Sequence, residues 1–142
     1  MKLSQIVSAY KTLGDTKVSK LEETEIIKIV KARKEMRKYV EEYEAFLKDC
    51  QDKFKPENWN TVLEKVQKWQ QEGDNTTLTE SERVEINKAL VTYQRRIDTA
   101  IKEELEKEIN ITIDKLKEDS LTKLLIENNW EMSKLDEIEI LL

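Results

Sequence analysis

The chain has 142 residues, of which 39% are charged and 38% are hydrophobic, and its net charge is −5. Two glycines, one proline, one cysteine and no histidine are present. This composition disfavours turn-rich sandwiches and barrels, and it excludes histidine-based catalysis, glycine-rich phosphate loops and cysteine-rich metal sites. We therefore expect one mainly α-helical domain over residues 1–142 that is not an enzyme and takes no cofactor, metal ion or small-molecule substrate.

The chain also lacks the signals of membrane insertion and export. Its longest interior aliphatic run covers only residues 124–126, whereas a membrane-spanning helix needs about 20 apolar residues. No apolar stretch of signal-peptide length follows the first residues, so we expect an unprocessed start. A single cysteine forms no internal disulfide, which favours a reducing compartment such as the cytoplasm.

A short helix is predicted at the beginning of the chain. Gly14 is expected to end it in a left-handed conformation. One face of this helix carries Leu3, Ile6, Val7, Tyr10 and Leu13.

The strongest pattern in the chain is an apolar seam with alternating spacings of three and four residues. It predicts a long helix from Ser19 to about Phe54, with one face that packs on another helix as in a coiled coil. Ser19 and Glu22 would form the capping box at its start. Arg33 interrupts the seam. It either fixes the register by contacting an acid on a facing helix, or belongs to a partly buried seam with its head in water, and we favour the second interpretation. The seam consists of Ile26, Ile29, Met36, Val40, Tyr43, Leu47, Cys50 and Phe54.

A short third helix and a second long helix are expected to follow. Pro56 suits the first turn of the third helix, and Gly73 ends it. Thr79 and Glu82 form a capping box for a helix that runs to about Glu108, whose apolar stripe suits antiparallel packing on the seam. An elongated bundle of two long antiparallel helices follows. The stripe consists of Ile86, Leu90, Tyr93, Ile97, Ala100, Ile101 and Leu105.

Two sets of residues are candidates for interaction with a partner. Tryptophans usually anchor cores, but Trp59 and Trp69 share their helix face with few other large residues, so this face is also a candidate contact surface with Val62 and Val66. The second set is the basic stretch of the long helix, which includes Arg33 and Arg37. Its members are Lys28, Lys31, Arg33, Lys34, Arg37 and Lys38.

The distribution of charge argues against a polyanion as the partner of this basic stretch. Residues 1–56 hold 13 basic and 10 acidic residues, whereas the remainder holds 12 and 20. The basic stretch is therefore expected to face the acidic half of this or another chain, and nucleic acid is an unlikely partner. Near Glu104 and Glu108, lysines are interleaved with the acids, so a solvated, paired helix face is favoured over a cation site.

The last third of the chain changes its hydrophobic period. Residues 109–114 alternate between β-branched and mostly polar side chains, which predicts a short strand, with a helix continuing through residue 116 as the alternative. Ser120 is expected to cap a short helix, and Ser133 with Asp136 a last one.

Several of these segments resemble a family of small helical proteins that tailed bacteriophages and prophages encode, a family without an assigned function. The resemblance covers residues 1–55 and 95–142, and residues 56–94 are interpreted as an insertion. It is carried by Met1-Lys2-Leu3, Lys17-Val18-Ser19, Ile29-Val30-Lys31, Tyr43-Glu44, Lys53-Phe54, Glu104-Leu105-Glu106, the segment 109–114, Leu121 and Met132-Ser133.

The resemblance implies a phage origin and a location in the cytoplasm of an infected or lysogenic bacterium or in the virion. Together with the residues, it favours a non-enzymatic accessory protein that acts by protein contact or self-association, in virion assembly or structure. The alternative is an inhibitor of a host protein, such as a defence protein. Mimicry of nucleic-acid charge is one form of this alternative, and the 25 basic residues interleaved among 30 acids argue against that form. A helical nucleic-acid-binding protein is the third hypothesis.

Overall fold

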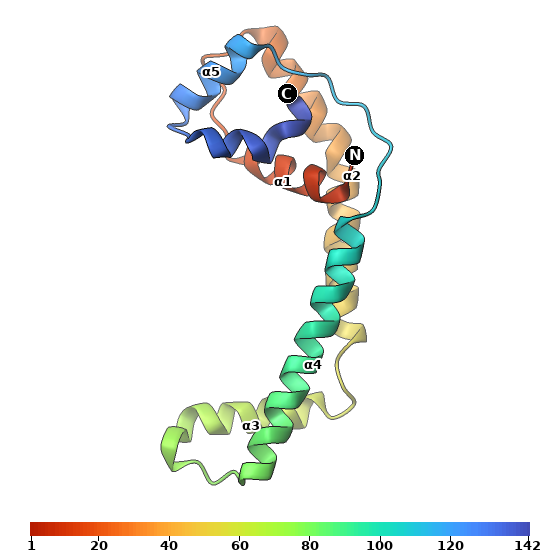
Figure 1. The fold of residues 1–142 in the computed structure, drawn as a ribbon, viewed down its shortest axis with the longest axis vertical. Coiled ribbons are helices and arrows are strands. Elements are labelled where there is room, and N and C mark those ends of the chain that lie inside the picture. The colour runs from red at the N-terminus through yellow and green to blue at the C-terminus, as the bar shows by residue number, and fades with distance from the viewer. The chain divides into compact units, whose positions relative to one another are not determined.

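A computed structural model describes residues 1–142, and it confirms the prediction that the chain is mainly α-helical (Figure 1). No strand is present. The elements are α1 (Leu3–Gly14), α2 (Glu23–Lys53), α3 (Trp59–Glu72), the 3₁₀ helix η1 (Gly73–Asn75), α4 (Glu80–Leu105), α5 (Glu118–Glu127) and the 3₁₀ helix η2 (Met132–Leu141).

The chain folds into two compact units. The first unit combines residues 1–45 with residues 103–142, and the second consists of residues 46–102. The second unit contains the whole of the 56–94 segment that the sequence suggested as an insertion. That 1–142 forms a single domain stays a prediction, and so does the antiparallel pairing of α2 with α4.

The core of the first unit is made by α1, the N-terminal part of α2, α5 and η2. α1 packs on η2, and Figure 1 shows these elements gathered around the first half of α2. The most deeply buried side chains come from all four elements: Ile6, Met36, Leu124, Ile138 and Leu141.

α1 forms where the apolar spacing predicts it, but Gly14 does not end it in a left-handed conformation, because only Gly73 among the glycines has a positive φ. Asp15 is the C-terminal cap residue, with φ −107°. Gly14 instead leaves room for a neighbour, since a Cβ there would lie 3.3 Å from Nη2 of Arg33.

α2 begins at Glu23 and not at Ser19, so the predicted capping box is wrong. The Ser19 hydroxyl donates to Glu127, and the Lys20 amide donates to the same carboxylate at 3.1 Å. Because the hydroxyl is used by a side chain of α5, it does not cap its own helix.

The buried face of α2 follows the predicted seam with a change in its first three turns, and further along the chain Leu47 and Phe54 are only half-buried. Met36, Val40, Tyr43 and Cys50 are buried as expected. Earlier in the helix, Glu25 and Ala32 are buried, whereas Ile26 and Arg33 are only half-buried. The arginine therefore lies at the edge of the seam and not within it.

The second unit contains the α3–α4 hairpin. α3 begins at Trp59, later than expected, because Pro56 accepts a hydrogen bond from the Trp59 amide in a turn that precedes the helix. Gly73 ends it with φ 58°, as predicted. The Thr79–Glu82 capping box is also confirmed: the Glu82 amide donates to Thr79 Oγ1 at 3.1 Å, and the Thr79 amide donates to Glu82 Oε1 at 3.2 Å.

The predicted strand at residues 109–114 is wrong, and the segment is not helical either. Its alternation is real, because Ile109, Ile111 and Ile113 are half-buried while the residues between them are exposed. No second strand lies beside it, however, and strand pairing is limited to one antiparallel bridge between Lys2 and Glu108. Alternating burial without a hydrogen-bonded neighbour gives an irregular segment.

The two short C-terminal helices exist, but their predicted caps are wrong. α5 starts at Glu118, so Ser120 lies inside the helix, where it is buried. The last helix is a 3₁₀ helix that starts at Met132, before Ser133, and is kinked at Ile138, where φ is −116°.

Candidate functional site

The predicted face of α3 packs inside its own unit. Val62 is buried with Leu78 and Ile86 of the α3–α4 hairpin, and the half-buried side chains Trp59, Val66 and Trp69 pack against them. The Trp59 ring lies 4.5 Å from the ring of Tyr93, centroid to centroid. The structure thus places all four of these site residues around one small core, and a contact role for this face stays a prediction.

Arg33 and Arg37 have different surroundings. The guanidinium of Arg33 lies over the ring of Tyr10, 4.4 Å from its centroid, and Arg33 forms no ion pair with an acid. Its buried Nε has no hydrogen-bond partner. A cation–π contact therefore takes the place of both the facing acid and the solvated head that the sequence suggested. Arg37 is exposed.

Sequence reasoning missed a buried carboxylate on α2. The Glu25 side chain is 1% exposed, and its Oε1 accepts hydrogen bonds from the Lys117 amide at 2.7 Å and from the Ser120 hydroxyl at 2.8 Å. The Lys28 ammonium lies 2.8 Å from Oε2 and also donates to the Lys115 carbonyl at 3.1 Å.

These contacts hold the pKa of Glu25 at about 2, well below 4.5. The hydrogen bond from Lys28 is the largest cause, followed by the Lys117 amide. The carboxylate thereby joins the first turn of α5 to α2, at a helix end where backbone amides need acceptors. The sequence did carry a signal for this contact: Glu25 is four positions before the seam residue Ile29 and therefore lies on the buried face of the helix.

The outer face of α2 in the first unit combines exposed apolar and basic side chains. Ile27 is 46% exposed and Val30 is 60% exposed. Lys31, Lys34 and Lys38 are exposed and form no ion pair. At 3.6 residues per turn these five side chains fall within about 100° of the helix circumference. We call them the α2 outer face.

A groove of about 370 Å³ runs beside this face, between α2 and the irregular segment. Lys28, Lys31 and Lys34 line it from the helix, and residues 112–114 line it from the other side. Two acids, Glu35 and Asp114, are part of the same lining, so the groove is mixed in charge.

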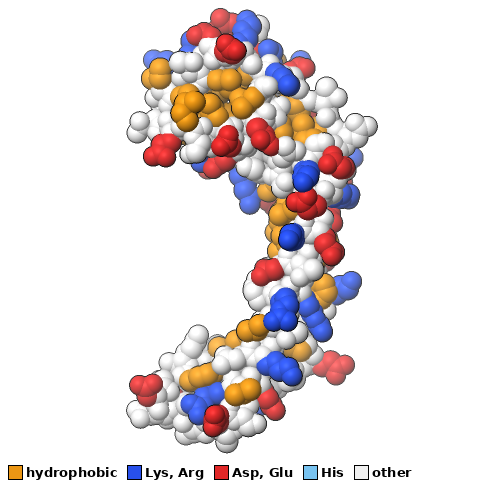
Figure 2. Space-filling model, viewed as in Figure 1, with side chains coloured by type: hydrophobic (Ala, Val, Ile, Leu, Met, Phe, Trp, Pro, Cys, Tyr) orange, Lys and Arg blue, Asp and Glu red, His pale blue; other side chains and the backbone are white.

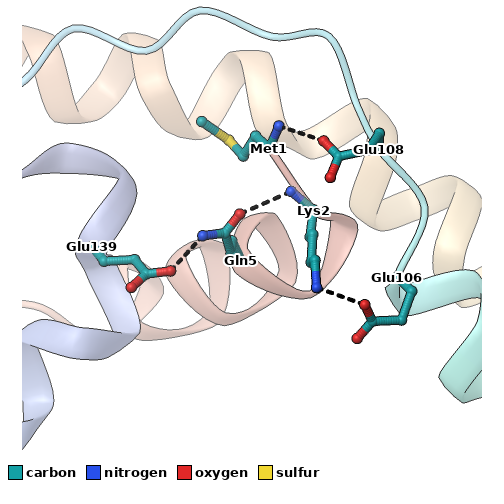
Figure 3. A network of polar contacts seen from close by, with 6 residues as sticks. All are labelled: Met1, Lys2, Gln5, Glu106, Glu108 and Glu139. Atoms are coloured by element: carbon teal, nitrogen blue, oxygen red, sulfur yellow. Dashed lines mark hydrogen bonds and ion pairs between the residues drawn. The ribbon is translucent and has the colours of Figure 1, made fainter.

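Polar contacts join the first residues of the chain to the segment after α4 and to η2 (Figure 3). The Met1 ammonium lies 2.8 Å from Glu108 and the Lys2 ammonium 2.6 Å from Glu106. The Gln5 side chain accepts from the Lys2 amide at 2.8 Å and donates to Glu139 of η2. The hydrogen bond with the Met1 ammonium lowers the pKa of Glu108, and the bond with Glu106 raises the pKa of Lys2.

Three of the acids near the end of α4 are engaged in ion pairs. Glu104 pairs with Lys107 at 3.8 Å, and Glu106 and Glu108 are held by the first two residues. The chain brings no three His, Cys, Asp or Glu side chains together as a metal site would require.

Comparison with known proteins found no matching family model, no similar curated protein and no similar solved structure. Within the chain, none of the helices has both the length and the apolar character of a membrane span.

Proposed function

We propose that this chain is a non-enzymatic accessory protein of a tailed bacteriophage or prophage, and that it acts by binding another protein in virion assembly or structure. The phage assignment rests on the sequence resemblance. The contact function rests on the α2 outer face, where two apolar side chains and three lysines without acidic partners share one stripe. The proposed place of action is the cytoplasm of the infected or lysogenic cell, or the virion.

The physical reason is the arrangement of this stripe. Ile27 and Val30 expose apolar area that burial would remove from water. Lys31, Lys34 and Lys38 extend over about 10 Å of helix beside them and carry no acidic partner within the chain. A protein surface with an apolar centre and an acidic border complements such a face, since unlike charges around an apolar contact favour association.

A capture experiment with charge-reversed variants tests this proposal. The chain is immobilised and exposed to lysate of infected or lysogenic cells, and the bound proteins are quantified. We expect one stoichiometric partner, which Lys31→Glu with Lys34→Glu releases. The matched control is Lys48→Glu, an exposed lysine of α2 that lies ten residues beyond Lys38 in the second unit, which should retain the partner. Capture that is equal with all variants would contradict the assignment of this face.

Self-association is a form of the same proposal. Light scattering coupled to size-exclusion chromatography should then show a mass that rises with concentration and returns to that of a monomer in Val30→Glu. A monomer at all concentrations, together with no captured partner, would contradict the contact function as a whole.

Contacts within the second unit support the further proposal that α2 and α4 pair as antiparallel helices. The Tyr93 hydroxyl of α4 donates to the Gln51 carbonyl of α2 at 3.0 Å, and Cys50 of α2 and Ile97 of α4 are both buried. Spin labels placed in pairs along the exposed sides of the two helices would test it. In an antiparallel pair the distance stays short when one label is moved towards the C-terminus of α2 and the other by the same number of residues towards the N-terminus of α4.

Two alternatives fit the same unpartnered lysines. A host defence protein as the captured partner would make the chain an inhibitor. Nucleic acid as the partner would give an affinity that falls steeply with salt and is lost in Lys31→Glu with Lys34→Glu. Fluorescence anisotropy with a labelled duplex at several salt concentrations distinguishes this outcome from protein binding.

A further inference from the structure

The second unit contains a pocket that the proposed function does not use. Its volume is about 380 Å³, within the range of about 300 to 1,000 Å³ typical of ligand pockets. It lies between the linker after α2 and one side of α4. Its lining includes Phe54, Pro56, Glu85, Lys88, Tyr93 and Arg96.

The apolar wall of this pocket is held in place from behind. The Tyr93 hydroxyl donates to the Gln51 carbonyl at 3.0 Å, and the Tyr93 ring packs on Trp59. Because both ends of the tyrosine are fixed, the wall does not have to be ordered when a ligand binds, which favours affinity. On the face of the second unit drawn in Figure 2, hydrophobic side chains reach the surface beside basic ones.

The rim of the pocket is predominantly basic. Lys88 and Arg96 both line it, both are exposed, and neither forms an ion pair. Glu85 is the one acid of the lining, and α4 has no further acid until Asp98. An anionic group next to an apolar one complements this rim and wall.

The spacing of the two cations indicates the length of the ligand. Lys88 and Arg96 are eight residues apart on one helix, which corresponds to about 12 Å. An extended peptide advances about 3.3 Å per residue, so two acids separated by three residues span a similar distance. The side chain midway between the two acids then lies opposite Thr92 and Tyr93.

We propose that this pocket binds an extended acidic segment of a partner protein, with an aromatic or branched aliphatic anchor and a carboxylate two residues before and two residues after it. The anchor occupies the pocket against Tyr93 and Phe54, and the carboxylates meet Lys88 and Arg96. This site is in the second unit, so it is independent of the α2 outer face.

Titration of the ¹⁵N-labelled full chain with a defined peptide tests the site. The probe is acetyl-Asp-Ser-Phe-Ser-Asp-amide. One control peptide has Ala in place of Phe, and the other has Asn in place of both Asp residues. We expect saturable amide shifts at Asn58, Thr92 and Arg96 with the probe, and affinity at least about tenfold lower for each control.

Variants of the protein separate the pocket from general charge. Lys88→Glu with Arg96→Glu should lower the affinity for the probe at least about tenfold, because two attractive contacts become repulsive. Arg95→Glu is the matched control, since Arg95 is exposed on the same helix but does not line the pocket, and it should lose less than about twofold. Thr92→Trp, which fills the pocket, should remove binding while the spectrum of the first unit is unchanged.

Three results would overturn the inference. The first is the absence of saturable shifts at about 1 mM peptide, because a dissociation constant above that concentration corresponds to less than about 4 kcal/mol of binding free energy. The second is equal affinity of the Lys88→Glu, Arg96→Glu variant and the unchanged chain. The third is a map of shifts on Ile27 to Lys38 or tighter binding of an oligo-dT than of the probe. Any of these results would leave the proposal for the α2 outer face standing, because that proposal is tested by variants in the first unit.

Discussion

Removal of the Glu25 charge should destabilise the first unit more than any other isosteric change on α2. In Glu25→Gln the buried group keeps an oxygen for Lys117 and Ser120 but loses the charge that pairs with Lys28. A pKa held at about 2 instead of 4.5 corresponds to about 3 kcal/mol at about 1.4 kcal/mol per unit. Since neutral hydrogen bonds remain, we expect a loss of about 2 to 3 kcal/mol at neutral pH.

The pH dependence gives a second signature with a definite sign. The folded-state pKa of Glu25 is lowered, so its contribution is fully present above pH 4.5 and is lost as the pH falls through about 2. The difference in unfolding free energy between the unchanged chain and Glu25→Gln should therefore shrink between pH 5 and pH 2.

Urea unfolding followed by circular dichroism measures the free energy, and amide exchange in α5 locates the change. Glu118→Gln is the control, because Glu118 is exposed in the first turn of α5 and has no ion pair. A Glu25→Gln chain within 0.5 kcal/mol of the unchanged one, or one with the same pH profile, would refute the reasoning, since about 0.5 kcal/mol is typical of neutral surface changes.

Three further predictions concern the second unit. Trp59→Ala removes the ring that packs on Tyr93 and should cost about 2 to 4 kcal/mol in urea unfolding. Thr79→Ala removes the hydroxyl that caps α4 through the Glu82 amide and should cost about 1 kcal/mol. Gly73→Ala should cost about 1 kcal/mol or more in thermal unfolding, because φ is 58° and a Cβ is strained there.

Each of these changes has a control in the same chain. Trp59→Phe keeps an aromatic ring and should retain most of the stability, and Ser81→Ala, at an exposed position of α4, should be neutral. Gly14→Ala should cost less than Gly73→Ala, because Gly14 is helical and its Cβ would lie 3.3 Å from Nη2 of Arg33, a contact that a small shift of the Arg33 side chain relieves. If Gly14→Ala costs as much as Gly73→Ala, the explanation by backbone strain is wrong.

Local rules predicted the elements whose causes are local. The Thr79–Glu82 capping box and the Gly73 end of α3 appear as expected, because each depends on residues within one turn of the chain. The predicted Ser19 cap is wrong because its outcome depends on a residue outside that turn. Its hydroxyl has a competing acceptor in Glu127, which is more than a hundred residues away in sequence.

The candidate contact residues illustrate a second limit. The Trp59 face was recognised as apolar, but only the structure shows that it packs on α4 of its own unit. An apolar face has the same pattern whether its cover comes from the same chain or from a partner. The lysines of the α2 outer face belong to the basic stretch that the sequence showed, but the exposed Ile27 and Val30 beside them and the α4 pocket were not predicted. Isolated apolar residues among charges, and a pocket between two elements, leave no periodic signal.

By itself, the sequence determined that the chain is helical, where most helices lie, and which face of α2 is buried from Met36 to Tyr43, because composition and periodicity act along one element at a time. Tertiary structure alone decided that Glu25 holds α5, that Arg33 lies on Tyr10, and that residues 109–114 have no strand beside them. Those outcomes depend on which residues from distant parts of the sequence pack next to each other, and the spacing of residues within one segment does not contain that information.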